Sequence, residues 1–375
     1  MIIKVTNKGE DLYKKNEFWG VYDDDGETLM AGGGVNTLQS RYCGNFISTL
    51  AIGGLGTGPE YRRRGCIRRI MEDAFALAPE RGWVVSMLHP FSYSYYRMFG
   101  YEKISDHKIL EFPMSALDCF ERCADLKRMN SEELIKDAIT IYDKFSENIN
   151  IMFRRYDSRH YKLNEKSDEP TTFIWYDKQC NPASYITLSV EKYYSVNRMV
   201  SINLNVYEMA FTSPESLSAL FGFMRMYEGE LETIKIHDCA MSPEIDLVLR
   251  HYMQTKYTII PDIMGRILNV EEFLKANTYP EEHGHFVVKV EDTLDFTRGV
   301  YEVEYENSEA EIKKIADTGN FDICVPMPAF TQMLYGYESF NVERAKYLQG
   351  VELKTDAKAF FKAFPKRDNG LFEHF

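Results

Sequence analysis

The sequence predicts a mixed α/β (α+β) fold made of two or three packed units. The chain has 375 residues, and one domain usually takes roughly 100 to 200 residues. Apolar residues make up 45% of the chain, which is enough to fill hydrophobic cores rather than leave the chain disordered. Extended and helical patterns alternate along the first third, as they do in sheets that are covered by helices.

The first third predicts a hairpin and then a strand that leads into a helix. Two extended runs, Phe18–Tyr22 and 28–32, flank an Asp-Gly turn, which is a hairpin signal. A third extended run covers 46–57 and ends before Gly58-Pro59. Apolar residues then recur every three or four positions, as on one face of a helix: Ile67, Ile70, Met71, Ala74 and Leu77.

The pattern continues with a buried strand at 83–88, a short helix at 94–99 and a strand at 101–112. The middle third resembles a second copy, with a hairpin at 173–190, an extended run at 201–210 and a helix that starts at Thr212-Ser213-Pro214. This second join between strand and helix lacks an Arg-x-x-Gly turn, so we expect it to be structural. The last part predicts helices at 271–276 and 328–335 around strands at 286–290 and 300–305.

The charge and composition limit which binding partners and which cell compartment we expect. The formal net charge is 44 − 57 = −13, which repels nucleic-acid phosphates and favours cationic small molecules. The longest uncharged stretch, 42–59, is short and interrupted by glycines, so no transmembrane helix is expected. The first residues lack a secretory pattern, and the seven cysteines form no CxxC pair. We therefore expect a cytoplasmic protein without nucleic-acid or membrane partners.

The strongest functional signal is the segment 55–68, in which a strand runs into a basic turn at the start of a helix. Unpaired N–H groups and a partial positive charge make such a helix start suitable for a diphosphate. Gly65 lets the backbone approach a ligand closely, and arginines add bidentate contacts to phosphate oxygens. The segment is neither a Walker loop nor a GxGxxG fingerprint. A solvated basic helix start is the alternative.

This segment resembles motif A of the GNAT N-acetyltransferases, and the resemblance is closest to the Eis (enhanced intracellular survival) family. The turn Pro-x-x-Arg-Arg-Arg-Gly at 59–65 and the run Tyr-x-x-Phe-Gly-Tyr at 96–101 match that family's forms. The segment 266–270 resembles the entry to its sterol-carrier-like domain, and the last residue is Phe. The resemblance implies tandem GNAT mixed-sheet domains at 1–125 and 126–265 and a sterol-carrier-like α+β domain at 266–375.

The resemblance also implies an acetyl-CoA-dependent N-acetyltransferase with acetyl-CoA as co-substrate and no metal. It assigns Tyr96 as general acid and the terminal carboxylate of Phe375 as general base. The acceptor would be a primary amine of a cationic small molecule, aminoglycoside-like or polyamine, or of lysine. Homo-oligomers, namely hexamers, are typical of the family. The expected cofactor-binding residues are Leu55, Gly56, Thr57, Arg63, Arg64, Gly65, Cys66, Ile67, Arg68, Phe91 and Ser92.

Other candidates are weaker. His89 could act as a base or be structural, and 281–285 (Glu-Glu-His-Gly-His) lacks the helical HExxH spacing of a metal site. Only seventeen residues precede Phe18, whereas the family has helices there that wall the acceptor pocket, so we expect a more open or differently built acceptor site. The alternative function is a non-catalytic protein that binds a lipid or hydrophobic ligand in its C-terminal domain.

Overall fold

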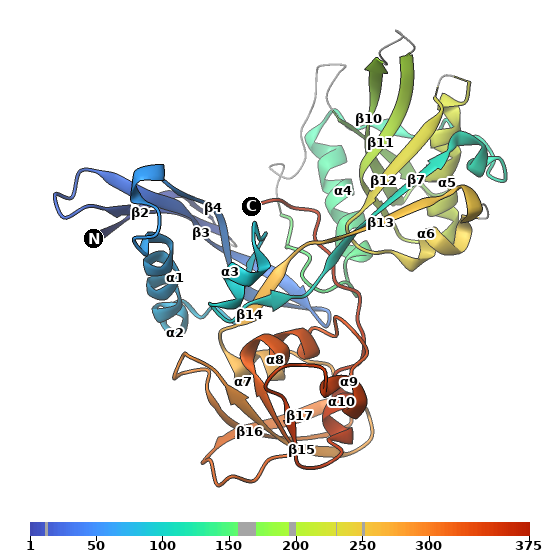
Figure 1. Ribbon diagram of the computed structural model, residues 1–375. Helices are drawn as coiled ribbons and strands as arrows, with labels where there is room; N and C mark the ends of the chain where they lie inside the picture. Colours follow the sequence, from blue (N-terminus) through green and yellow to red (C-terminus); the bar gives the residue numbers. More distant parts are fainter. Residues whose placement is uncertain (12–13, 157–169, 195–199, 230, 250–251) are drawn as a thin grey trace.

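The computed structural model describes residues 1–11, 14–156, 170–194, 200–229, 231–249 and 252–375. Over these residues the chain forms three mixed sheets, of seven, seven and five strands, each with helices packed against it (Figure 1). The predicted mixed α/β (α+β) class is therefore confirmed. No helix among the described residues is long and apolar enough to cross a membrane.

The first sheet contains the segment with the strongest functional signal. Its strands are antiparallel from β1 to β4, and β4 pairs with β5 in parallel. α1 (Cys66–Ala76) packs against it with buried Ile70, Met71 and Ala74, followed by α2 (Ala78–Arg81) and α3 (Tyr93–Arg97). The strand order is β1 (Ile2–Asp11), β2 (Lys14–Tyr22), β3 (Leu29–Tyr42), β4 (Asn45–Thr57), β5 (Val85–Leu88), β14 (Met264–Ile267) and β6 (Glu102–Lys103).

The second sheet repeats this arrangement strand for strand. Its β11 and β12 pair in parallel, as β4 and β5 do. The helices α4 (Glu132–Phe145), α5 (Pro214–Met224) and α6 (Pro243–Val248) belong to this part. The order is β8 (Lys127–Arg128), β9 (Thr171–Tyr176), β10 (Pro182–Tyr194), β11 (Val200–Phe211), β12 (Thr233–Asp238), β7 (Asp106–Pro113) and β13 (Lys256–Pro261).

The two sheets exchange one strand each. β7 follows β6 in the chain but pairs with β12 and β13 in the second sheet. β14 follows β13 but pairs with β5 and β6 in the first sheet. Because both exchanged strands take the same place, between the fifth strand and an edge strand, each sheet is completed by a segment from the other half of the chain.

The third sheet has the order β17 (Glu309–Ile315), β16 (Gly299–Glu306), β15 (Gly284–Glu291), β18 (Ile323–Pro326) and β19 (Glu352–Leu353). The helices α7 (Val270–Lys275), α8 (Met327–Leu334), α9 (Val342–Ala345) and α10 (Lys358–Ala363) accompany it. Its inner face is packed with apolar side chains; the rings of Phe286 and Phe360, both fully buried, lie 5.3 Å apart. The buried Arg266 on β14 donates two hydrogen bonds to Asp292 and so ties this part to the first sheet.

Several local expectations differ from the structure. The strand expected at 101–112 is two strands, β6 and β7, because the chain leaves the first sheet after Lys103 and enters the second at Asp106. β1 and α4 were not expected, and the sheets do not divide at residues 125 and 265, since β7 and β14 cross over. Short 3₁₀ helices complete the elements, at Pro59–Tyr61, Met114–Leu117, Arg225–Tyr227 and Tyr252–Gln254.

Candidate active site

A wedge opens between β4 and β5 in the first sheet. The two strands pair at Thr49, Leu50 and Ala51 with 85–87. Beyond Ala51, β4 runs on to Thr57 paired with β3, whereas β5 ends at Leu88. The edge of β4 that faces β5 therefore has unpaired main-chain groups along the end of the strand. Leu55, Gly56 and Thr57 lie in this end of β4.

A β-bulge in β4 lies at the mouth of this wedge. Gly34 pairs with Gly53 and Gly32 with Gly56, so β4 has one more residue than β3 between these pairs. Gly54 has φ +61°, a backbone conformation that glycine adopts without steric cost. Because a bulge leaves the extra residue outside the ladder, β4 can present a main-chain N–H here as a hydrogen-bond donor.

The start of α1 forms the second part of the candidate cofactor site. Gly65 is the N-cap with φ 84°, and no side chain caps this helix start. The N–H groups of Cys66, Ile67 and Arg68 belong to the first helical turn, which has no intrahelical acceptor for them, and Arg69 N–H is the first to bond back, to Gly65 O. A Cβ at Gly56 or Gly65 would meet nothing within 4 Å. The turn is therefore open to a ligand at its positive end.

The side chains of the turn divide into exposed arginines and a buried thiol. Arg63, Arg64 and Arg68 are exposed, and the Arg68 guanidinium lies 5.3 Å from the centre of the Phe99 ring. The Cys66 side chain is buried, with Sγ 3.9 Å from Met1 Sδ. A ligand in the turn would thus meet the main chain of Cys66 and not its thiol.

Tyr96 lies on α3 with a buried ring, and burial raises the pKa of its phenol to about 12. Its ring meets Phe91 and Tyr95 edge-on at 5.4 and 5.3 Å. Among the described residues the Tyr96 hydroxyl has no hydrogen-bond partner. Phe91 is 75% exposed, and Ser92 is the N-cap of α3, where its side chain accepts from Tyr95 N–H.

Phe375 lies against the bulge in β4. A Cβ added to Gly53 would overlap the carboxyl carbon and oxygen of Phe375, so glycine is needed here for the last residue to approach. The Phe375 ring packs 5.0 Å from the His89 ring and 5.3 Å from the Phe153 ring. The structure thus brings Phe375 and the wedge together, while no ring contact joins Phe375 to Tyr96 in the described part of the chain.

His89 holds the segment before Phe375. It lies just beyond β5, its Nε2 is 3.1 Å from Glu373 O, and its Nδ1 is 3.3 Å from Asp262 Oδ1. The ring also lies 4.7 Å from that of His374. Because both ring nitrogens have protein partners, the structural interpretation of His89 has direct support.

A buried ion-pair network in the second sheet fixes the same segment. The Arg155 guanidinium donates to Glu373 at 2.6 Å and to both oxygens of Glu208 at 2.6 and 3.0 Å. The side chain of Arg155 is 2% exposed and lies over the Tyr142 ring. Burial raises the pKa of Glu373, and the positive charge of Arg155 opposes this shift. The segment before Phe375 is therefore held by side chains of both sheets.

Sequence reasoning missed Gly53, Arg155 and Glu208. The pair Gly53-Gly54 inside an apolar strand was the available signal, because glycines in a strand often mark a bulge or a close backbone approach. No local pattern marks Arg155, which is 218 residues from Glu373. The cluster at 281–285 forms no metal group among the described residues; His283 and His285 pair with Glu304 and Glu302.

A comparison with known families matches the part of the chain that forms most of the first sheet. Residues 4–104 match the family described as acetyltransferase (GNAT) domain. The protein is a transferase. The matched GNAT domain spans the chain from β1 to β6 and contains the wedge, the bulge and the open turn, and GNAT domains use acetyl-CoA as co-substrate. The alternative of a non-catalytic binding protein is thus not supported. A search of curated proteins found no match.

Solved structures share the fold over nearly the whole chain. A protein of Enterococcus faecalis V583 described as a probable N-acyltransferase is 22% identical, with a TM-score of 0.81 over 96% of this chain and 89% of that chain. A GCN5-related N-acetyltransferase from Anabaena variabilis is 16% identical, with a TM-score of 0.81 over 96% and 89%. Eis1 from Mycobacterium abscessus is 17% identical, with a TM-score of 0.76 over 96% and 91%. At these identities the likeness is one of fold.

Proposed function

We propose that the protein transfers the acetyl group of acetyl-CoA directly to a primary amine. The acceptor is a cationic small molecule, aminoglycoside-like or polyamine, or a lysine side chain. The diphosphate of the co-substrate binds at Arg63, Arg64 and the N–H groups from Gly65 to Arg68. Its pantetheine arm lies along Leu55, Gly56 and Thr57, and Phe91 and Ser92 add a further contact, in which Ser92 can use its main chain because its hydroxyl caps α3.

In the proposed reaction the amine nitrogen attacks the thioester carbonyl, so that a C–N bond forms and the C–S bond breaks. A main-chain N–H at the bulge of β4 stabilises the oxyanion. The carboxylate of Phe375 takes the proton from the amine, and Tyr96 gives its proton to the departing thiolate. A phenol with a pKa of about 12 stays protonated at neutral pH and is therefore available as an acid.

One observation carries this proposal: Phe375 meets Gly53 on the splayed strand of the GNAT domain. The contact supports a carboxylate beside the thioester, and the networks of Arg155 and His89 support its being held there. An α-carboxylate is intrinsically a weak base, with a pKa near about 3.5. The cationic acceptor favours a role of this carboxylate in binding the ammonium as well as in accepting its proton.

The wider organisation is part of the same proposal. The units are built mainly from 1–125, 126–265 and 266–375. The first two are GNAT domains that exchange β7 and β14, so their sheets do not follow these bounds, and the third is a sterol-carrier-like domain that delivers the C-terminal segment. The identical strand order of the first two sheets supports the tandem arrangement. We further propose a cytoplasmic homo-oligomer, a hexamer, on the resemblance to the Eis family. Because the described residues before β2 form the strand β1 and no helix, the acceptor side is open to large amines.

The function is tested by measuring thiol release from acetyl-CoA with a panel of polyamines, aminoglycosides and lysine peptides. We expect thiol release that depends on at least one amine and an acetylated amine of matching amount by mass spectrometry. Binding of acetyl-CoA without acetyl transfer to any amine of the panel would contradict the proposed acceptor class. Failure to bind acetyl-CoA would contradict the cofactor site itself.

A further inference from the structure

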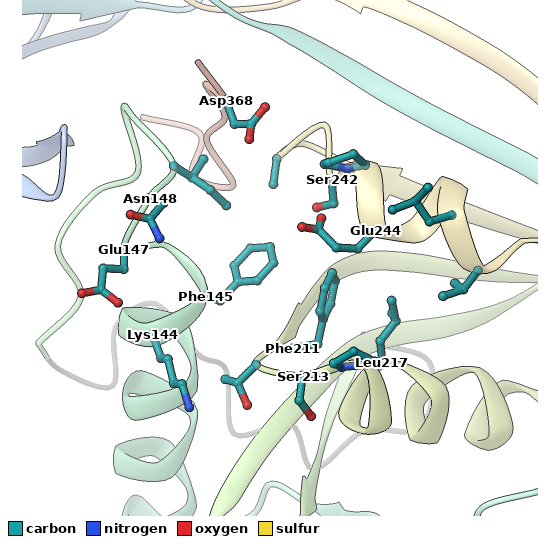
Figure 2. A pocket seen from close by; sticks show the side chains of 17 residues that line it. Lys144, Phe145, Glu147, Asn148, Phe211, Ser213, Leu217, Ser242, Glu244 and Asp368 are labelled. Atoms are coloured by element: carbon teal, nitrogen blue, oxygen red, sulfur yellow. The ribbon is translucent and has the colours of Figure 1, made fainter. Parts of the chain in front are cut away.

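A second cavity lies in the second sheet, at the place that corresponds to the wedge of the first. It has a volume of about 670 Å³ and lies between the end of α4, the join of β11 and α5, and α6 (Figure 2). A volume of this size is in the usual range for small-molecule sites, roughly 300–1,000 Å³. Because β11, α5 and α6 follow one another as β4, α1 and α3 do, the cavity lies at the join that corresponds to the open turn of the first sheet.

The second cavity is unsuited to a diphosphate. The helix start that faces it is already capped, since Ser213 accepts from Ser216 N–H and the Ser216 side chain accepts from Ser213 N–H. Pro214 has no N–H to offer, and Glu215 places a negative charge in the first turn of α5. The first join suits a phosphate because it has open N–H groups and arginines. At the second join a capped helix start and Glu215 take their place.

The cavity instead combines aromatic faces with carboxylates. Phe145 and Phe211 line it, together with Glu244 and Asp368. Figure 2 shows the Glu244 carboxylate pointing into the cavity beside Ser242 and Phe145, whereas the ammonium of Lys144 points away. Burial and the charge of Glu244 raise the pKa of Asp368, against the opposing effect of Lys366. Two carboxylates in a partly apolar cavity repel each other, and a positive charge between them stabilises the ionised form of both.

We propose that this cavity binds small organic ammonium ions that carry an apolar or aromatic body. The ammonium lies between Glu244 and Asp368, where ion pairing is strengthened by the partly apolar surroundings. The apolar body packs on Phe211 and Phe145, whose ring faces also attract the cation. This site is separate from the proposed acetyl-transfer site, and its ligand need not be acetylated.

The cavity is connected to the segment that ends at Phe375. Asn150 N–H donates to Asp368 O, and Gly370 N–H donates to Asn150 O. The Phe372 ring stacks on Phe145, with centroids 6.0 Å apart and planes 13° apart. A ligand whose ammonium pairs with Glu244 and Asp368 and whose body packs on Phe145 therefore contacts two residues that are joined to this segment, and we expect its binding to change the KM or kcat of acetyl transfer.

The test is calorimetric titration of the full-length protein with benzyltrimethylammonium, which has no N–H and cannot be acetylated. Phenylacetate, which carries the same ring and the opposite charge, is the ligand control. We expect benzyltrimethylammonium to bind at least roughly tenfold more tightly than phenylacetate. Equal binding of the two ligands, or no binding of benzyltrimethylammonium at millimolar concentration, would overturn the proposal.

Variants locate the binding. Glu244→Gln and Asp368→Asn remove one charge each at exposed positions, and each is expected to weaken benzyltrimethylammonium about fivefold or more, or ~1 kcal/mol. Glu352→Gln, an exposed change of the same charge on β19, should leave the affinity unaltered. Affinity that is equal in all three variants would place the ion elsewhere, including the acceptor cleft, and would contradict this site. Circular dichroism confirms that each variant is folded.

Discussion

At the scale of single residues, the phenol of Tyr96 can be tested apart from cofactor binding. Tyr96→Phe removes the hydroxyl and keeps the buried ring, so the fold and the affinity for acetyl-CoA should stay the same. Loss of a general acid typically costs about 100-fold or more, and we expect kcat to fall by this order in a thiol-release assay. Tyr95→Phe, on the same helix, is the matched control and should retain kcat. Unchanged turnover in Tyr96→Phe would remove Tyr96 from the mechanism.

The contact between Gly53 and Phe375 gives a second test at this scale. Gly53→Ala places a methyl group where the Phe375 carboxyl lies, and because Gly53 is not in the left-handed region, the backbone itself tolerates alanine. We expect kcat/KM for the amine to fall by about tenfold or more, with acetyl-CoA affinity preserved. Deleting Phe375 should lower activity as well. In the deletion background Gly53→Ala should have little further effect, and additive losses would show that the two positions act independently.

At the scale of elements, the network around Arg155 holds the last residues of the chain against the second sheet. Arg155→Met leaves Glu208 and Glu373, whose side chains are 17% and 13% exposed, without the positive charge of the buried Arg155. Loss of one partner of a buried ion pair costs about 3–5 kcal/mol, and urea unfolding should show a decrease of this order. Arg155→Met combined with Glu373→Gln should regain part of it. A stability equal to that of the parent would mean that water already compensates these charges.

The histidines on β12 and β7 predict how stability depends on pH. Burial, then Lys235 and His107, lowers the pKa of His237 to about 4, while Glu191 opposes this shift; Tyr207 stacks on the ring. An unfolded histidine titrates near about 6.5, so between these values the unfolded chain binds a proton that the folded chain does not. Stability is therefore lost as pH falls from 6.5 towards 4.

The corresponding measurement is thermal unfolding at pH 7 and pH 5. We expect His237→Gln to lose less of its Tm on acidification than the parent does, because glutamine does not titrate. His283→Gln, at an exposed position just before β15, should follow the parent. The same decrease in all three proteins would assign the pH dependence to other groups, such as the carboxylates around the last residues.

Local patterns predicted the elements that local chemistry determines. The helix after Gly65 and the Asp-Gly hairpin were found because periodicity and turn residues lie within a few positions of each other. The short helix that carries Tyr96 was predicted for the same reason, whereas the roles of Tyr96 and of the turn before α1 were expected from the family resemblance and stay predictions. The break between β6 and β7 was missed because it depends on which sheet each segment joins. The partners of Glu373 were missed because they lie far away in the sequence.

At the scale of the whole molecule, strand exchange makes the first two sheets one folding unit. A fragment of residues 1–125 lacks β14, so β5 and β6 lose the strand between them, and its β7 has no sheet to join. We expect this fragment to be unfolded or aggregated by circular dichroism and size exclusion, whereas a fragment of residues 1–267, which holds every strand of both sheets, should be folded. A well-folded 1–125 fragment would contradict this view.

The place of β14 has a consequence for synthesis on the ribosome. Domains often fold in order as the nascent chain emerges, but here the GNAT sheet stays incomplete until Ile267 has left the exit tunnel. Until then the nascent sheet exposes the unpaired side of β5 to solvent or to a chaperone. Translation pauses placed after this strand, rather than after α3, would be the ones that help the protein to fold.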